Sequence, residues 1–168
     1  GVGVLFVKHN VEISPIMFGG GQERGLRSGT ENSVTAAGLA TALEVAVKMR
    51  EKESARLTKL RDYAIAEILK EVPCSSLNGD QEKRLPNNIN ICFPGQDSEF
   101  LVIKLDILGF SVSAASACSN LNLENSSYVI ESLRKPNCSS SSLRFTLGRE
   151  TKKSDIDSLI KTLKKIVK

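Results

Sequence analysis

A glycine-rich run at residues 19–30 (GGGQERGLRSGT) has the composition of an anion-binding loop. Five of its twelve residues are glycine, which suits backbone that turns tightly or approaches a ligand closely. Arg27 adds a guanidinium, and Thr30 could cap a following helix, so a cation, backbone N–H groups and the helix dipole could meet one anion. An ordinary connection between a strand and a helix, with Thr30 as the N-cap, fits the same residues. The spacing leaves both interpretations open.

Arg144 lies in a segment, residues 142–149 (SLRFTLGR), in which apolar and polar residues alternate. The alternation predicts a strand with Leu143, Phe145 and Leu147 on one face and with Arg144 on the other. An arginine that leaves a core on a rigid strand suits two-point binding of a carboxylate. A structural ion pair with an aspartate or glutamate is the alternative, and the residues alone favour it.

Cys118 lies among small polar residues in a segment, 113–122, that is typical of a loop. An accessible thiol in a loop can react as a thiolate, whereas Cys92 has the neighbours of a strand residue. The chain's one histidine, His9, is not placed to pair with Cys118, so a protease-like cysteine–histidine mechanism is disfavoured. Cys118 is therefore either a nucleophile of another kind or an inert loop cysteine.

The composition is that of a protein able to bury its own core. The chain has 168 residues, of which 40% are hydrophobic and 25% charged, so we expect one globular domain or one domain with a strip of another. The net charge is +4, and much of the excess lies in lysines near the C-terminal end. A solvated helix face explains these lysines better than direct nucleic-acid binding, for which interleaved aromatic residues are missing.

The cysteine spacing and the hydropathy exclude further classes. The four cysteines lie far apart without a C-x-x-C pair, so this chain is not expected to ligate zinc or an iron–sulfur cluster. No apolar run approaches the ~20 residues needed to span a bilayer, and we expect no membrane association, a cytoplasmic location and free thiols. An apolar run at residues 2–7 has no upstream partner, which predicts that the sequence is part of a longer protein.

The hydrophobic pattern predicts an α+β fold in which helices cover one face of a largely antiparallel sheet. Two strands joined by a turn at His9-Asn10 are expected first, followed by a long helix with a bend or break at residues 49–54. Ser154, with Asp157 three residues later, predicts the capping box of the last helix. The predicted strands are residues 3–8, 13–18, 74–77, 88–93, 110–113 and 143–147, and the predicted helices are residues 30–70, 98–108 and from 154 onward.

Three motifs, in this order, resemble those of one enzyme family. Residues 19–32 (GGGQERGLRSGTEN) are similar to the family's signature, residues 116–119 (SACS) to its catalytic-cysteine loop, and residues 142–149 to its substrate-binding strand. The family is the cysteine desulfurases of the NifS/IscS type, within the class V aminotransferase-like enzymes that use pyridoxal phosphate. The motifs spread over nearly the whole chain, which makes the resemblance specific.

The resemblance implies a role for each candidate residue. Cys118 would take sulfur from L-cysteine as a persulfide and leave alanine, and Arg144 would hold the α-carboxylate of the substrate. Thr30 would reach the phosphate of pyridoxal phosphate in the other subunit of a homodimer, with Arg27 supporting that loop. The sulfur would pass to an acceptor or an iron–sulfur scaffold protein, for cluster assembly or tRNA thiolation. No metal site is implied.

The resemblance also implies that the chain is the C-terminal part of such an enzyme. Residues 1–45 would end the large cofactor domain of a three-layer α/β transferase fold, and residues 46–168 would form the small C-terminal α+β domain. The Schiff-base lysine of the family lies upstream of residue 1. Lys8 is not expected to replace it, and the chain alone should be inactive.

Two other functions fit the same residues. A selenocysteine lyase shares the fold, the cofactor and the cysteine. A non-catalytic split or degenerate chain that only scaffolds or relays persulfide sulfur would account for the missing lysine.

Overall fold

The computed structural model describes residues 1–114, 127–133 and 135–167. The chain divides into two compact units, Gly1–Arg50 and Glu51–Lys168, and each is described by itself. The division falls inside the long helix α1 (Ser33–Glu71). The assignment of residues 1–45 and 46–168 to a large and a small domain stays a prediction.

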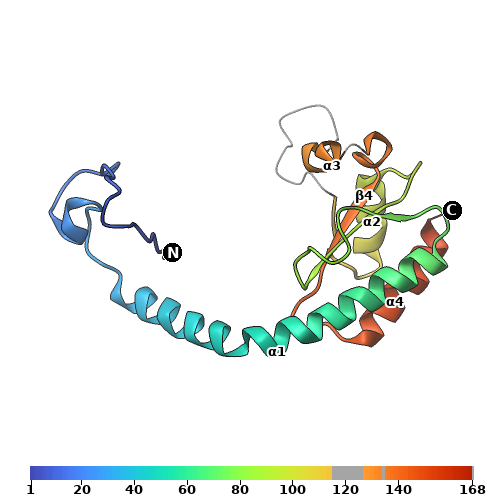
Figure 1. Cartoon of the computed structure of the whole chain (residues 1–168), viewed down its shortest axis with the longest axis horizontal. Coiled ribbons are helices and arrows are strands. Elements are labelled where there is room, and N and C mark those ends of the chain that lie inside the picture. Colours follow the sequence, from blue (N-terminus) through green and yellow to red (C-terminus); the bar gives the residue numbers. More distant parts are fainter. Residues whose placement is uncertain (115–126, 134, 168) are drawn as a thin grey trace. The chain divides into compact units, whose positions relative to one another are not determined.

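The second unit has an α+β fold built on a four-stranded antiparallel sheet (Figure 1). The order of the strands is β1-β2-β4-β3. The predicted fold class is therefore confirmed. The strands are β1 (Ser76–Leu77), β2 (Asn88–Cys92), β3 (Ser113–Ala114) and β4 (Ser142–Thr146). The remaining elements are α2 (Ser98–Ile107), α3 (Tyr128–Ser132), the short 3-10 helix η2 (Pro136–Cys138) and α4 (Lys153–Ile166).

One hydrophobic core lies between the sheet and the helices α1, α2 and α4. Ile89 and Ile91 of β2, with Leu143 and Phe145 of β4, point into it, because alternate residues of a strand share a face. The helices thus cover one face of the sheet, as predicted. The helical core residues are Leu57, Ala64, Ile65 and Ile68 of α1, Leu101 and Leu105 of α2, and Ile156, Leu159, Ile160 and Leu163 of α4.

Helix α1 is one continuous helix from Ser33 to Glu71, so the predicted break at residues 49–54 does not occur, and a bend there stays a prediction. Those residues (MREKES) are mostly good helix formers, and helical hydrogen bonds are local, so the helix continues without tertiary support there. The buried residues of α1 begin only at Leu57. The interruption of the hydrophobic pattern instead marks the point where the helix begins to pack on the core.

The two predicted N-terminal strands, residues 3–8 and 13–18, are absent from the first unit. The turn between them is present, with the Val11 N–H donating to the Lys8 carbonyl at 3.1 Å. A strand needs a partner for its backbone N–H and C=O groups, and within the described residues none pairs with either segment.

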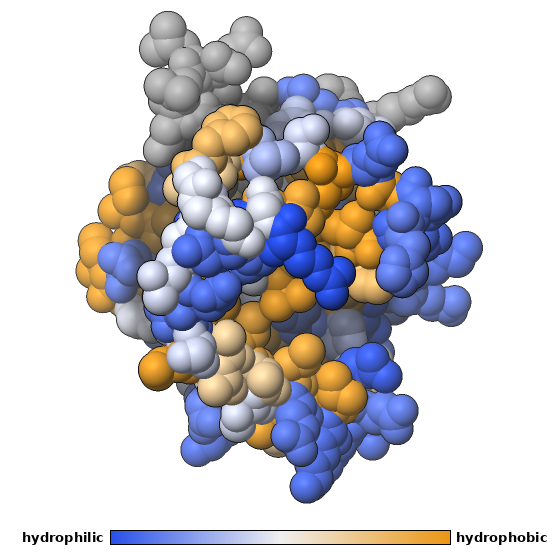
Figure 2. Space-filling view, turned by 90° about the vertical axis from the view of Figure 1, so that its left-hand side faces the viewer, coloured by the Kyte–Doolittle hydropathy of each residue, from blue (hydrophilic) through white to orange (hydrophobic). Residues whose placement is uncertain are grey.

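The apolar side chains of these N-terminal segments are exposed for the same reason. Val4 and Phe6 are each 82% exposed, and Phe18 is 83% exposed. Figure 2 shows apolar side chains at the surface among hydrophilic ones on the face that it draws. The first unit therefore exposes more apolar surface than is usual for a folded domain.

Helix α4 begins one residue earlier than predicted, and other residues cap it. Lys152 is the N-cap, and the Asp155 carboxylate accepts its backbone N–H at 2.9 Å. Ser154, the predicted cap, lies inside the helix, so that prediction is wrong. The Asp157 carboxylate instead accepts the hydroxyl of Tyr63 on α1 at 2.6 Å, a tertiary contact that the local pattern does not encode.

Two of the four cysteines form a disulfide, so the expectation of free thiols is wrong for this pair. Cys92 at the end of β2 and Cys138 of η2 are bonded, with their Cα atoms 5.3 Å apart. Together with Ile130 of α3 they form a second, smaller buried cluster. Cys74 is a free and exposed cysteine. The pairing depends on how η2 packs beside β2, which cysteine spacing does not encode.

None of the helices in the described part of the chain is both long and apolar enough to cross a bilayer. The described residues also contain no group of three His, Cys, Asp or Glu side chains that could hold a metal ion.

Reduction of the Cys92–Cys138 disulfide should lower the free energy of unfolding by about 2–4 kcal/mol, because the bond closes a loop across a sequence separation of 46. Denaturant unfolding with and without reductant measures the change. The variant Cys92→Ala/Cys138→Ala should lose the dependence on reductant, whereas Cys74→Ser should keep it. A wild-type unfolding curve that reductant does not move would contradict the prediction.

Acid should loosen the attachment of α4 to α1. Lys164 Nζ lies 2.6 Å from the Glu71 carboxylate, and this hydrogen bond lowers the pKa of Glu71 from its ordinary value of 4.5. The hydrogen bond from Tyr63 lowers the pKa of Asp157 in the same way. A carboxylate with a lowered folded-state pKa stabilises the fold above its unfolded-state pKa, and this contribution is lost as the pH falls through the folded-state value.

We therefore expect the free energy of unfolding in urea to fall as the pH drops below about 4.5, and to fall less steeply in Glu71→Gln. Glu44→Gln is the control, because Glu44 is an exposed glutamate of α1 that forms no ion pair with the described residues. If the free energy of unfolding depended on pH equally in the wild type and in Glu71→Gln, the ion pair would not contribute to stability.

Candidate functional site

Arg144 lies on β4, which has a neighbouring strand on each side. The antiparallel register places Arg144 opposite Asn90 of β2 on one side and opposite Ser113 of β3 on the other. Arg144 is exposed, whereas Leu143 and Phe145 beside it are buried. The predicted alternation is confirmed, and the guanidinium stands on the face of the sheet opposite the core.

Arg144 has no carboxylate partner within the described residues. Its Nη2 donates to Ser113 Oγ at 3.3 Å, and that hydroxyl donates to the Ala114 carbonyl at 2.9 Å. The structural ion pair, which the residues alone favoured, is thus not formed in the described part of the chain. A planar cation with spare N–H donors on a rigid strand can bind a carboxylate at two points.

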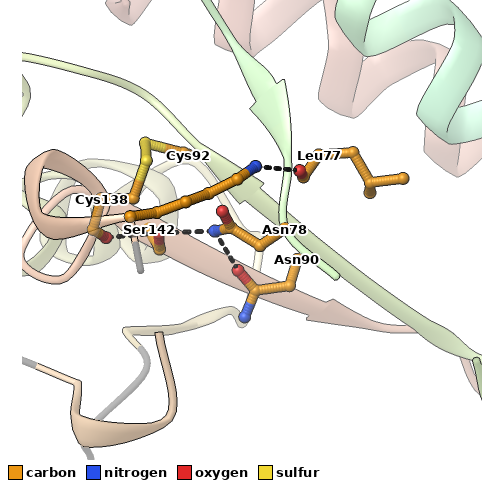
Figure 3. The surroundings of a disulfide bond; sticks show 7 residues. Leu77, Asn78, Asn90, Cys92, Cys138 and Ser142 are labelled. Atoms are coloured by element: carbon orange, nitrogen blue, oxygen red, sulfur yellow. Dashed lines mark hydrogen bonds between the residues drawn. A yellow bond between two sulfur atoms is a disulfide. The ribbon is translucent and has the colours of Figure 1, made fainter. Parts of the chain in front are cut away.

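A network of polar side chains lies on the same face of the sheet as Arg144. Figure 3 shows this network. The Ser142 hydroxyl donates to the Cys138 carbonyl at 2.5 Å and accepts from Asn78 Nδ2 at 2.8 Å. The same Nδ2 donates to Asn90 Oδ1 at 2.9 Å. Asn78 is 3% exposed, and its Oδ1 has no hydrogen-bond partner within the described residues. The network joins the disulfide-bonded Cys138 to Asn90, the residue opposite Arg144.

The backbone around Asn78 is held from several directions. Its N–H donates to the Asn90 carbonyl at 2.9 Å, and its carbonyl accepts from Arg84 Nη2 at 2.6 Å. Burial lowers the pKa of the Arg84 guanidinium. Lys135 Nζ donates to the carbonyl of the preceding residue, Leu77, at 2.7 Å. The backbone position of Asn78 beside the sheet is therefore well fixed.

Cys118, the candidate nucleophile, lies outside the described residues. The segment that carries it, residues 115–126, follows β3 directly and ends before Ser127. Ala114, the last described residue before this segment, pairs with the residue of β4 that precedes Arg144. Ser127 caps α3, with its hydroxyl accepting a backbone N–H of that helix. Both ends of the segment are thus anchored in the unit that contains Arg144.

The glycine-rich run forms a loop in the first unit and includes the 3-10 helix η1 (Gln22–Gly25). Gly25 and Gly29 have φ values of 79° and 116°, a region that glycine adopts at little steric cost. The Ser28 hydroxyl donates to the Gly20 carbonyl at 2.9 Å and closes the loop on itself.

Thr30 and Arg27 are both exposed in this loop. Helix α1 is capped by Asn32, whose Oδ1 accepts the Thr35 N–H at 3.1 Å, so the prediction of Thr30 as N-cap is wrong. Arg27 donates one N–H to the Ser28 carbonyl and keeps further donors. An exposed hydroxyl and a guanidinium are suitable donors for a phosphate, so these residues fit the phosphate of pyridoxal phosphate.

The structure brings Arg144, Ser113 and Asn90 together, and of these the sequence singled out only Arg144. Asn90 carried a weak signal, because it alternates with buried isoleucines in β2 and must therefore point away from the core. Asn78 and Ser142 carried none, because their role depends on pairing between segments distant in sequence. Arg27 and Thr30 belong to the other unit, which is described by itself.

Known proteins resemble the chain along nearly its whole length. The aminotransferase class-V family matches residues 1–159. Cysteine desulfurase IscS of Dictyoglomus turgidum is 40% identical over 168 residues, covering 99% of this chain and 42% of the relative. Cysteine desulfurase IscS 1 of Archaeoglobus fulgidus is 41% identical over 167 residues, covering 99% of this chain and 44% of the relative. A solved structure of a NIFS-like protein has a TM-score of 0.82 at 26% identity, covering 96% of this chain and 40% of that chain.

The chain thus spans about two-fifths of the length of the curated relatives that it matches. The family match itself extends from residue 1 to residue 159 and includes the glycine-rich loop, the Cys118 segment and the Arg144 strand. On this evidence the chain belongs to the aminotransferase class-V family.

Proposed function

We propose that the complete protein carrying this chain is a cysteine desulfurase, which moves sulfur from L-cysteine to Cys118 and releases L-alanine. The observation that carries the proposal is Arg144, an exposed guanidinium with no carboxylate partner among the described residues, on a strand next to the one that leads into the Cys118 segment. An arginine and a thiol in one site suit a substrate that has both a carboxylate and a sulfur atom. Relatives at 40% and 41% identity carry the name of this activity.

The chain length between β3 and Cys118 supports the proposal. Cys118 follows Ala114 by four residues, a stretch that spans at most about 14 Å. Ala114 pairs with the residue of β4 that precedes Arg144. A substrate cysteine bound through its carboxylate at Arg144 would therefore present its sulfur within the range of the Cys118 thiol.

Arg144 and Cys118 would have separate tasks. Arg144 binds and orients the substrate. The Cys118 thiolate attacks the substrate sulfur, so a sulfur–sulfur bond forms while the carbon–sulfur bond breaks with its electron pair left on carbon. That carbon takes up a proton and leaves as alanine, and Cys118 keeps the sulfur as a persulfide. Pyridoxal phosphate, when bound, supplies the electron sink for the carbon that loses sulfur.

Thr30 and Arg27 would hold the phosphate of this cofactor. Both are exposed in a loop rich in glycine, and both keep hydrogen-bond donors that no described residue accepts. Thr30 would act on the cofactor of the other subunit in a homodimer, and the Schiff-base lysine would come from the part of the protein that precedes this chain.

We place the enzyme in the cytoplasm, where it would pass sulfur to an acceptor or an iron–sulfur scaffold protein. A persulfide suits this task because a second thiol can take its outer sulfur by exchange. The Cys92–Cys138 disulfide is compatible with a reducing compartment, because a reductant must reach a sulfur atom to break the bond. Cys92 is 0% exposed and Cys138 is 7% exposed, so both sulfur atoms are shielded.

Cys118→Ser should abolish sulfide release from L-cysteine by the complete enzyme and leave cofactor binding intact, because a serine hydroxyl is a poor nucleophile toward sulfur. Sulfide release and the visible absorbance of the cofactor are the two measurements. Cys74→Ser, which removes the exposed free cysteine, is the control and should behave as the wild type. A Cys118→Ser protein that loses its cofactor, or one that still releases sulfide, would contradict the assigned role.

Arg144→Lys should raise the KM for L-cysteine about tenfold or more, because one ammonium cannot reproduce two-point binding of a carboxylate. Steady-state kinetics of alanine formation give KM and kcat separately, and kcat should change less. Arg149→Lys, at an exposed arginine beyond the end of β4, should leave both unchanged. A wild-type KM in Arg144→Lys would remove Arg144 from the site.

A further inference from the structure

Asn90 is the residue of β2 that faces Arg144 across the strand pair. We propose that its side-chain amide is a second donor for the carboxylate of the substrate, held in the donating orientation by Asn78 and Ser142. The inference rests on the proposed function and extends it, because it adds a binding residue and two positioning residues to the carboxylate site.

The backbone carbonyl of Cys138 can only accept hydrogen bonds. The Ser142 hydroxyl lies 2.5 Å from that oxygen and donates to it. A serine hydroxyl has a single hydrogen, so Ser142 has none left for another partner. Toward Asn78, 2.8 Å away, the Ser142 oxygen can therefore only accept.

This requirement fixes the amide of Asn78. Its NH₂ group must face Ser142, because an amide oxygen in that place would meet a lone pair. The second hydrogen of the same Nδ2 is directed to Asn90 Oδ1 at 2.9 Å. The orientation persists although it leaves Asn78 Oδ1 buried without a partner among the described residues. The opposite orientation would break both hydrogen bonds.

The orientation of Asn90 follows from that of Asn78. Since Asn90 Oδ1 accepts from Asn78, its Nδ2 must lie on the far side of the amide, as Figure 3 shows. That Nδ2 forms no hydrogen bond with the described residues. Asn90 and Arg144 are directly opposite in the register, and such pairs share a face with their Cβ atoms about 5 Å apart. Two spare donors of Asn90 are thus presented next to the spare donors of Arg144.

The neighbours of Arg144 differ in what they can offer a ligand. Ser113 on the other side donates its one hydrogen to the Ala114 carbonyl and accepts from Arg144, so it has no donor left. Asn90 has donors and no accepting atom free on that side. A carboxylate, which only accepts, therefore matches the side of Arg144 toward Asn90. An amine or a hydroxyl ligand would gain less there.

Asn90→Asp is the decisive substitution, because aspartate keeps the oxygen that accepts from Asn78 and replaces the outward NH₂ with a negative charge. It should raise the KM for L-cysteine about 100-fold or more in the complete enzyme, through loss of a donor and repulsion of the carboxylate. Asn90→Ala should raise it about tenfold. Asn88→Ala, the same residue type on the same face of the same strand, should change it less than about twofold.

A binding readout separates these effects from catalysis. The dissociation constant of L-alanine, followed by the cofactor absorbance, should rise with KM in both Asn90 variants. Ethylamine, which is alanine without its carboxylate, should bind the wild type and both variants equally. Ser142→Ala, which frees the Asn78 amide to turn, should weaken L-alanine binding to an intermediate extent.

If Asn90 has only a structural role, the two Asn90 variants should rank in the opposite order of KM. Asn90→Ala would then be the more harmful variant, because it removes the acceptor of Asn78, and Asn90→Asp would resemble the wild type; this result overturns the inference. Arg144→Lys weakening L-alanine while both Asn90 variants bind it normally would also overturn it and leave the proposed function standing. A wild-type enzyme that neither binds L-alanine nor releases sulfide would overturn the proposed function and this inference together.

Discussion

The pairing of β4 with a strand on each side is the constraint on which the second unit depends. It places Asn90, Arg144 and Ser113 in one row across three strands. A slip of one residue would turn Arg144 into the core and Leu143 with Phe145 toward solvent, because side chains alternate between the two faces. Exposing one such apolar side chain lowers the free energy of unfolding by about 1.5–3 kcal/mol. Burial of Leu143 and Phe145 therefore also fixes the Arg144 guanidinium on the opposite, exposed face of the sheet.

The polar network on the opposite face is held by segments that come from several parts of the chain. Asn78 lies after β1, Ser142 begins β4, and Cys138 lies in η2, where the disulfide ties it to β2. Asn78 Oδ1 is a buried acceptor with no partner among the described residues, which costs about 1–3 kcal/mol, and the two hydrogen bonds of its Nδ2 offset this cost. A buried polar group that keeps such a cost calls for an explanation, and the orientation that it imposes on Asn90 supplies one.

Local sequence patterns predicted much of the second unit, whereas contacts between residues distant in sequence were missed. The alternation in residues 142–146 predicted which face Arg144 occupies, because a strand's period is a local property. The disulfide joins residues 46 positions apart, and the Asn78 network includes a hydrogen bond between residues 64 positions apart, so no local window of sequence predicts either. The predicted strands at residues 3–8 and 13–18 did not form because apolar alternation specifies a strand only when another strand pairs with it. The glycine-rich loop was predicted correctly as irregular, while its cap was assigned to Thr30 instead of Asn32.

As proposed, this chain carries the sulfur-accepting and substrate-binding part of a desulfurase. The most direct test is release of sulfide and alanine from L-cysteine with added pyridoxal phosphate, measured for this chain and for a form extended upstream to include the lysine-bearing segment. The account predicts equal amounts of sulfide and alanine from the extended form and neither product from residues 1–168 alone. A folded extended form that binds the cofactor but releases neither product would contradict it.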